Sequence, residues 1–200
     1  MKSRMLFLFV IYCNFTFAQI ASDREKIKNI LKEISVKAIE LGDLEYTKMQ
    51  LDSSWIGYSS ATQKEIEKTE KRLRISLPQD YKDFLMLTNG FQAASNVEPS
   101  FSSCNKIGFL KNVDNELCQI WIKDGVKEVG LKLKTAIKVG GFDEEQYFFL
   151  IPPSKKNPNW EYWVFASWAP GETIFYSLFE YFQFVLETTI EFSEDKKQSE

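Results

Sequence analysis

The sequence predicts an α+β fold with N-terminal helices, a central, largely antiparallel sheet and a C-terminal closing helix. Three observations predict it. Apolar residues at helical spacing dominate the chain up to Gly90, short β-prone runs follow, and helical spacing returns after Ser177. Separate runs of helices and strands, as opposed to strict alternation, are typical of α+β domains. The 200 residues suffice for one domain with its own core, or for a domain with a small extension.

Residues 1–18 have the order of a secretory signal peptide. Lys2 and Arg4 precede an apolar run over residues 5–12, and Ala18 supplies the small residue at a cleavage point. The run is shorter than the roughly 20 apolar residues that cross a membrane. Cleavage would remove two positive charges, change the net charge from −3 to −5 and place the protein in the periplasm or medium. The alternatives are a lipid anchor, or an apolar N-terminus that belongs to the fold of a cytoplasmic protein.

Residues 19–49 form an extension that carries an amphipathic helix over residues 23–41. Asp23 is suited to the N-cap of this helix and Gly42 to the position after its end. We expect the helix to pack on the domain or against a partner. Six apolar residues recur at helical spacing: Ile27, Ile30, Leu31, Ile34, Ala38 and Leu41.

A second helix is predicted to begin after Thr62. Thr62 and Glu65 have the spacing of a capping box, in which each side chain accepts a hydrogen bond from an unpaired backbone N–H. The helix must end before Pro78, because the residue preceding a proline is pushed out of the helical region. Its apolar face is formed by Ile66, Thr69 and Leu73.

The stretch "LPQDYKDFLMLTNG", residues 77–90, predicts a third, short helix. Pro78 fits its first position, where the missing N–H has no cost. Gly90 can adopt the left-handed conformation that closes a helix. The face of the helix is formed by Tyr81, Phe84, Leu85 and Thr88.

The strands are predicted at "KIGFL", "CQIWI", "TAIKV", "QYFFLIP" and "EYWVFASW". A final helix follows in "LFEYFQFVLETTIEF", and Ser177 and Glu180 repeat the capping-box spacing at its start. Residues 193–200 form a polar tail. Two cysteines remain after cleavage, Cys104 and Cys118, and either a disulfide or two free buried thiols is compatible with their number.

Several kinds of catalytic chemistry are missing from the chain. It contains no histidine, which excludes Ser-His-Asp triads, Cys-His pairs and His-based zinc sites. Neither a P-loop nor a dinucleotide fingerprint occurs, and "VGGFDEEQ" has the wrong glycine spacing. Catalysis by carboxylates alone remains open, but no sequence feature singles out a pair of acidic residues for it. We therefore predict a protein without catalytic residues, cofactor or metal.

The charge is distributed unevenly along the chain. Residues 140–195 contain ten acidic side chains and two lysines, a net charge of −8, whereas residues 19–139 have a net charge of +2. An acidic region repels nucleic acid and attracts a basic protein surface. The alternative is a solvated face that only keeps the protein soluble. Candidate partner-binding residues are Asp143, Glu144, Glu145, Glu161, Trp168 and Glu172.

Features of the local sequence explain why the acids at 143–145 and Trp168 are chosen. Asp143 and its two acidic neighbours follow a Gly-Gly turn, which predicts an exposed loop tip. Trp160 and Trp163 would lie on opposite faces of a strand, so at least one is expected in the core. Trp168 lies in the turn "SWAPGE" and is the best candidate for an exposed anchor.

The segment "SSATQKEIEKTEKRLRISLPQDYKDFLMLTNGF" resembles the signature of the SUKH superfamily, the Smi/Knr-type domain. The later "WEYWVFASWAPGETIFYSLFEYFQFVL" is similar to the family's last strand, turn and closing helix, and the resemblance covers about residues 50–192. The positions that carry the motif are Trp55, Gly57, Ile66, Glu70, Leu77, Pro78, Tyr81, Phe84, Leu85, Asn89 and Gly90.

The resemblance implies a non-enzymatic protein-binding domain, of the kind that in bacteria binds a cognate toxin and occludes its active site. The implied partner is a toxin domain with a basic surface. Inhibitors of cytoplasmic toxins have no signal peptide, so an exported copy would act on an envelope toxin. The alternative is an envelope scaffold or regulatory interaction module with no toxin partner.

Overall fold

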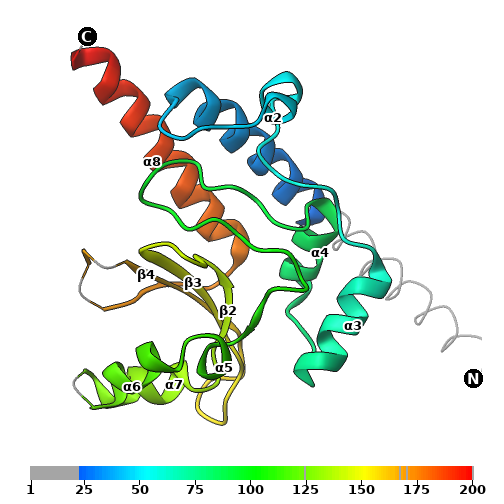
Figure 1. Cartoon of the computed structure of the whole chain (residues 1–200), viewed down its shortest axis with the longest axis vertical. Coiled ribbons are helices and arrows are strands. Elements are labelled where there is room, and N and C mark those ends of the chain that lie inside the picture. Colours follow the sequence, from blue (N-terminus) through cyan, green and yellow to red (C-terminus); the bar gives the residue numbers. More distant parts are fainter. Residues whose placement is uncertain (1–22, 124, 167, 170, 200) are drawn as a thin grey trace, which may run out of the picture.

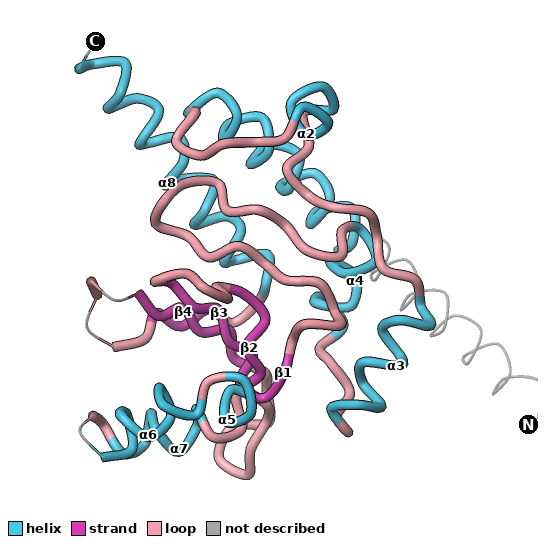
Figure 2. Tube along the Cα trace, viewed as in Figure 1, coloured by secondary structure: helices cyan, strands magenta, loops and turns pink. Residues whose placement is uncertain are grey.

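The fold is built around a single antiparallel sheet. A computed structural model describes residues 23–123, 125–166, 168–169 and 171–199, so the predicted signal peptide lies outside the described residues. The sheet's strands follow one another in space in chain order, β1-β2-β3-β4-β5, and helices cover both faces (Figure 1; Figure 2). The predicted α+β class, with N-terminal helices, a central antiparallel sheet and a C-terminal helix, is confirmed.

The strands are short, and both of their faces are buried. In β3, Phe148 and Leu150 contribute to one hydrophobic cluster, whereas Phe149 and Ile151 contribute to another. This two-residue alternation means that the two clusters lie on opposite faces of the sheet. The strands are β1 (Gly108–Phe109), β2 (Ile137–Gly140), β3 (Gln146–Ile151), β4 (Glu161–Ala166) and β5 (Thr173–Phe175).

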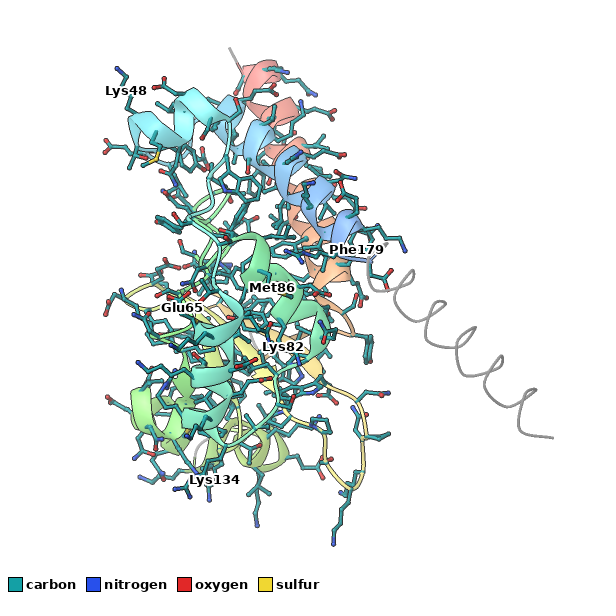
Figure 3. The ribbon with its side chains drawn as sticks, turned by 90° about the vertical axis from the view of Figure 1, so that its right-hand side faces the viewer. Lys48, Glu65, Lys82, Met86, Lys134 and Phe179 are labelled. Carbon is teal, nitrogen blue, oxygen red and sulfur yellow. The ribbon has the colours of Figure 1, made fainter. Side chains whose placement is uncertain are left out.

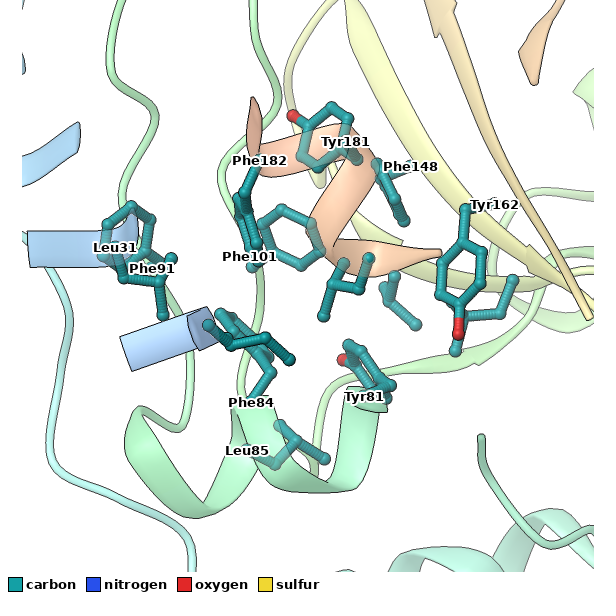
Figure 4. Packing of buried hydrophobic residues seen from close by; sticks show 14 of the residues in the cluster. Leu31, Tyr81, Phe84, Leu85, Phe91, Phe101, Phe148, Tyr162, Tyr181 and Phe182 are labelled. Carbon is teal, nitrogen blue, oxygen red and sulfur yellow. The ribbon is translucent and has the colours of Figure 1, made fainter. Parts of the chain in front are cut away.

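The first face carries the larger core. Phe101 lies at its centre, with ring centroids 4.8 Å from Phe148, 5.1 Å from Phe84 and 5.6 Å from Phe182 (Figure 4). All six apolar residues of the N-terminal helix are buried, and five of them, all but Leu41, belong to this core, so that helix packs on the domain. The helices of this side are residues 23–41, α2 (Lys48–Ser53), α3 (Gln63–Leu73), α4 (Gln79–Leu87) and α8 (Leu178–Ser199).

The second face carries three short helices that are consecutive in the chain. Figure 3 shows Lys48 of α2 and Lys134, just beyond α7, at opposite ends of the molecule. The helices are α5 (Leu110–Val113), α6 (Asn115–Lys123) and α7 (Lys127–Leu133). Their core residues, with those of the sheet beneath them, are Leu110, Cys118, Val129, Leu133, Ala136, Phe149, Ile151, Trp163 and Phe165.

Helix α6 corrects the prediction of a strand at "CQIWI". Cys118 is fully buried, while Leu117 and Trp121 pack partly against the same cluster, which is helical spacing. The N–H of Leu117 donates to Oδ1 of Asp114 at 3.2 Å, which helps to start the helix. The predicted strand "KIGFL" also differs, since only Gly108 and Phe109 pair in the sheet and α5 begins at the next residue.

The capping box of α3 is confirmed, and its predicted face of Ile66, Thr69 and Leu73 is buried. At α8, the N–H of Glu180 donates to the Ser177 hydroxyl at 3.0 Å, but the Glu180 carboxylate accepts from Tyr176, one residue earlier than a capping box requires.

Two predicted roles at α4 are wrong. Pro78 is the N-cap, one position before the predicted first helical residue. Gly90 does not close the helix, because α4 ends at Leu87 and Thr88 caps it in an extended conformation.

The two cysteines are free and buried. Cys104 belongs to the first-face cluster and Cys118 to the second-face cluster, so the sheet separates them and the disulfide alternative is not realised. None of the helices in the described residues is both long and apolar enough to cross a membrane.

Candidate partner-binding surface

The antiparallel register brings five of the six predicted partner-binding residues to one end of the sheet. Gln146, at the start of β3, pairs with Ala166, at the end of β4. The turn before β3 and the loop after β4 therefore lie at the same end of the sheet. The turn carries Asp143, Glu144 and Glu145, and the loop carries Trp168 and Glu172. We call these five residues the sheet-end group.

The three acids of the turn are not equivalent. Asp143 and Glu145 are exposed, and Asp143 has a left-handed backbone with φ of 64°. Glu144 is half-buried, and its Oε2 accepts a hydrogen bond from the Ser100 N–H at 2.9 Å. The prediction of three exposed loop-tip acids is therefore wrong for Glu144, because its carboxylate anchors a neighbouring loop.

Lys138, in β2, is a basic residue whose charge interacts with two acids of this turn, Asp143 and Glu144. Its Nζ lies 4.3 Å from the centroid of the Tyr147 ring and 3.9 Å from the Asp114 carboxylate. Burial lowers the pKa of Lys138, while the charges of Asp114, Asp143 and Glu144 act in the opposite direction. The positive charge of Lys138 therefore partly offsets the negative charge of the turn.

Trp160 and Trp163 pack on opposite faces of the sheet, as the alternation of side chains along a strand predicts. Trp163 is buried in the second-face cluster, and Trp160, just before the strand, packs partly on the first. Trp168 has 52% of its surface exposed. Glu172, later in the same loop, is half-buried. An exposed indole beside carboxylates suits contact with a basic protein surface.

Glu161 lies away from the sheet-end group. It begins β4, opposite Ile151 at the other end of the sheet. Only 7% of its surface is exposed, and its carboxylate accepts from Lys132 at 2.8 Å and from the Trp163 indole N–H at 2.9 Å. These hydrogen bonds hold Glu161 inside the fold, so we do not carry it into the candidate surface.

Most of the family-motif residues build the core and the turn between α3 and α4. Oε1 of Glu70 accepts from the Leu77 N–H at 2.7 Å and lies 3.6 Å from the Lys82 ammonium, which fixes the turn. Pro78 then starts α4. The remaining core members of the motif, all buried, are Ile66, Leu77, Tyr81, Phe84 and Leu85.

The other motif residues meet where three loop segments cross. Oδ1 of Asn89 accepts from the Cys104 N–H at 2.7 Å, and the Asn89 N–H donates to the Ser59 carbonyl at 2.9 Å. A Cβ on Gly57 would lie 2.5 Å from the Thr88 hydroxyl oxygen and 2.7 Å from the Trp55 ring. Glycine at this position therefore allows the indole to lie directly on the backbone.

Gly90 has a comparable role beneath Tyr58. Its φ is +115°, and a Cβ there would lie 3.1 Å from the Phe101 carbonyl oxygen and 3.2 Å from the Tyr58 ring. The Tyr58 N–H also donates to the Gly90 carbonyl at 3.2 Å. Positive φ and close backbone approach both explain a glycine at this position.

Two surface hollows open over this crossing. One, of about 560 Å³, we call the Trp55 hollow, and the other, of about 620 Å³, the Ser100 hollow. They share Tyr58 and Asn89, and Glu144 of the sheet-end group lines the second. The motif crossing and the sheet end thus both contribute residues to the lining of the Ser100 hollow.

Sequence reasoning missed Met49 and Tyr58, which lie on this surface. Helix α2 carries Met49, and its start has a capping box formed by Thr47 and Gln50, so that spacing could have revealed the helix. Nothing in the sequence marks Tyr58, because its position depends on the loop crossing beneath it.

The surface is suited to binding. Among the described residues, no group of three or more acidic or cysteine side chains is arranged to hold a metal ion. What the hollows and the sheet end offer is shape, exposed aromatic rings and negative charge, which are the means by which proteins recognise other proteins.

A sequence model of the SMI1 / KNR4 family (SUKH-1) matches residues 60–184. The match includes the α3–α4 block, the Asn89-Gly90 pair and the sheet-end group, and it begins after Trp55 and Gly57. No curated protein matches the chain.

Proposed function

Because the chain belongs to the SMI1 / KNR4 family (SUKH-1), we propose that it is an immunity-type protein, which binds a toxin domain and blocks its active site. In this proposal the protein acts without catalysis. The partner is recognised as a folded surface, and its substrate is kept out by the bulk of the bound chain.

The observation that carries the proposal is the sheet-end group. Asp143 and Glu145 are exposed at one loop tip, and the half-exposed indole of Trp168 lies in a loop at the same end of the sheet. Opposite charges accelerate association and fix its orientation, so an acidic surface favours a toxin domain that presents a basic surface around its active site. An acidic end with an aromatic anchor would cover such a basic site.

The proposal predicts that a toxin domain is encoded beside this chain in its genome, and that domain is the partner to be used in the test. Cells that express the toxin domain should grow only when the chain is also expressed, and the two purified proteins should form a complex that inhibits the toxin's activity. A chain that neither protects cells nor binds this domain would contradict the proposal and favour an interaction module with no toxin partner.

The contribution of the sheet-end group is tested with a triple variant, Asp143→Asn, Glu145→Lys and Glu172→Lys. Asparagine is chosen at 143 because it tolerates the left-handed backbone, and Glu144 is left unchanged because it anchors Ser100. We expect association with the toxin domain to slow roughly tenfold or more, with a weaker dependence on salt.

A matched control places the same charge change elsewhere. The variant Glu187→Gln, Glu191→Lys and Glu194→Lys changes exposed acids of α8 and also raises the net charge by five units. Its association rate should stay within about twofold of the unchanged protein if position matters more than net charge. Equal slowing in both variants would mean that overall charge, and not the sheet end, governs association.

We also propose that the protein is exported, on the basis of the predicted signal peptide in residues 1–18. The partner would then be a toxin that acts in the envelope. Intact mass of the protein from its own host tests this: export requires a periplasmic or secreted species that lacks residues 1–18, whereas a full-length cytoplasmic species would contradict it.

A further inference from the structure

The Trp55 hollow has no charged side chain in its lining. Its walls are uncharged polar and apolar groups. The lining residues are Thr47, Met49, Gln50, Ser53, Trp55, Gly57, Tyr58, Ser59 and Asn89. A charged side chain would lose its hydration here without gaining an ionic partner, so the hollow suits an uncharged group.

Large apolar surfaces are exposed at this hollow. Met49 is 78% exposed and Tyr58 is 54% exposed, while Trp55 is half-buried on its floor. Exposed methionine and aromatic side chains around a concave surface are typical of protein contact sites.

The hollow is formed in advance by the fold. Trp55 is held edge-on against Phe91, with ring centroids 5.6 Å apart. Helix α2 is tied to the loop beneath it, because the Gln50 side-chain amide donates to the Ile56 carbonyl at 3.0 Å. A site that is already ordered loses little conformational entropy when a partner binds.

The character of the surface changes from one hollow to the next. The Ser100 hollow shares Tyr58 and Asn89 with the Trp55 hollow and has Glu144 in its lining, next in the chain to exposed Asp143 and Glu145. Lys106 also lines the Ser100 hollow, on its own exposed loop. A partner that spans both hollows therefore meets an uncharged cavity at one end and carboxylates at the other.

We infer that the partner binds in two parts: one uncharged apolar side chain inserts into the Trp55 hollow beside Met49 and Tyr58, while basic side chains lie over the sheet-end group. The inference rests on the proposed function and defines the partner segment by its chemistry, an apolar anchor joined to basic residues. The apolar anchor supplies affinity, and the basic part fixes the orientation of the partner and raises the association rate.

The test uses the same toxin domain and two hollow variants, Tyr58→Ala and Ser53→Arg. The first removes the exposed ring, and the second fills the hollow with a charged side chain from an exposed position. Tyr176→Ala is the control, since Tyr176 is 71% exposed and lies outside both hollows. Unfolding midpoints in urea establish that each variant is folded.

Each hollow variant should weaken the complex roughly tenfold or more through faster dissociation, with the salt dependence unchanged. The control should bind within about twofold of the unchanged protein. Hollow variants that bind as tightly as the control, while the sheet-end variant still slows association, would overturn this inference and leave the proposed function intact. A chain that does not bind the toxin domain at all overturns both.

Discussion

The two faces of the sheet are covered by different kinds of structure. The first face is closed by helices from both ends of the described chain, residues 23–41 and α8, together with α3 and α4. The second face is closed by α5, α6 and α7, which come from one continuous stretch of sequence. The first core is therefore held by contacts between distant segments and the second mainly by local ones.

The comparison of the two faces indicates which of the two cores supports the candidate binding surface. The motif crossing around Asn89 is anchored to the first-face core through Phe91 and Phe101, which pair with each other in the backbone. The candidate surface thus lies on the side with the larger core. No residue of α5, α6 or α7 is in the lining of either hollow, so we expect local opening of these helices to leave both linings in place.

Replacement of Phe101 by alanine should have the largest effect on stability. Its ring contacts aromatic rings from α4, β3 and α8, so its loss leaves a cavity where distant segments meet. We expect the free energy of unfolding, measured in urea, to fall by about 3–5 kcal/mol. A loss below about 1 kcal/mol would contradict the central position of this ring.

The variant Leu133→Ala should have a smaller and more local effect. Leu133 is fully buried between α7 and the second face. We expect a cost of about 2–3 kcal/mol, with hydrogen-exchange protection lost first over residues 110–134. Protection in α4 and α8 should persist under conditions where α6 and α7 already exchange. Simultaneous loss on both faces would show that the sheet couples them tightly.

Glu161 on the second face should make stability fall in acid. Burial alone would raise the pKa of Glu161, but hydrogen bonds from Lys132, Asn157 and Trp163 outweigh burial and lower it below the ordinary 4.5. The stabilisation is therefore present at neutral pH and lost as the pH falls through the lowered value. Glu161→Gln should cost about 1–2 kcal/mol at pH 7, as measured in urea.

The cost of the Glu161→Gln variant should shrink as the carboxyl of the unchanged protein becomes protonated. A cost that is equal at neutral and strongly acidic pH would contradict the ionised state of Glu161. Lys132→Met is a suitable companion variant, because it removes the ammonium, which lies 4.8 Å from the centroid of the Trp163 ring, and keeps an unbranched apolar side chain.

Glu98 on the first side should have the opposite pH dependence. It is 4% exposed, and among the described residues its Oε1 has no hydrogen-bond partner. Burial raises the pKa of Glu98, against the hydrogen bond from Ser95, and the Asp43 charge adds to the rise. Stability from this site is complete below the ordinary 4.5 and decreases as the pH rises through the raised value.

Glu98→Gln should remove this decrease and leave the protein at neutral pH as stable as the unchanged chain, or more so. Urea unfolding at several pH values measures the difference between the two proteins. A strong destabilisation at neutral pH would contradict the argument, because it would mean that the ionised carboxylate is satisfied by groups such as Ser95.

The cysteines should show the smallest effect. Cys104 and Cys118 are free and lie on opposite faces of the sheet. Addition of a reducing agent should leave the urea midpoint unchanged, and intact mass should show both thiols available for alkylation after unfolding. A midpoint that falls on reduction would indicate a disulfide and would contradict the separation of the two clusters.

The long, locally specified elements were predictable from the sequence. The capping box at Thr62, the face of α3 and the buried face of residues 23–41 follow from spacing alone, because each pattern repeats over several turns. Helix α6 was not predictable in the same way. Its nine residues read equally well as a β-prone run, and the deciding fact is that Cys118 and Trp121 must both face the sheet.

The candidate site shows the same division. Asp143, Glu145, Trp168 and Glu172 were selected from the sequence, but only the strand register places their two loops at one end of the sheet and Glu161 at the other. The capping-box spacing of Thr47 and Gln50 could have revealed the helix that carries Met49, but Tyr58 had no local signal, since the hollow it lines exists only where three loop segments cross.

The sequence by itself determined the class of fold, the start and face of the main helices, the absence of histidine chemistry and the uneven charge. These follow from composition and short-range periodicity, which are properties of neighbours in the chain. The tertiary structure alone decided which carboxylates face solvent, which accept hydrogen bonds within the fold, and where the hollows lie. Those properties depend on contacts between residues far apart in the chain, and no local pattern encodes which distant segment will supply the partner.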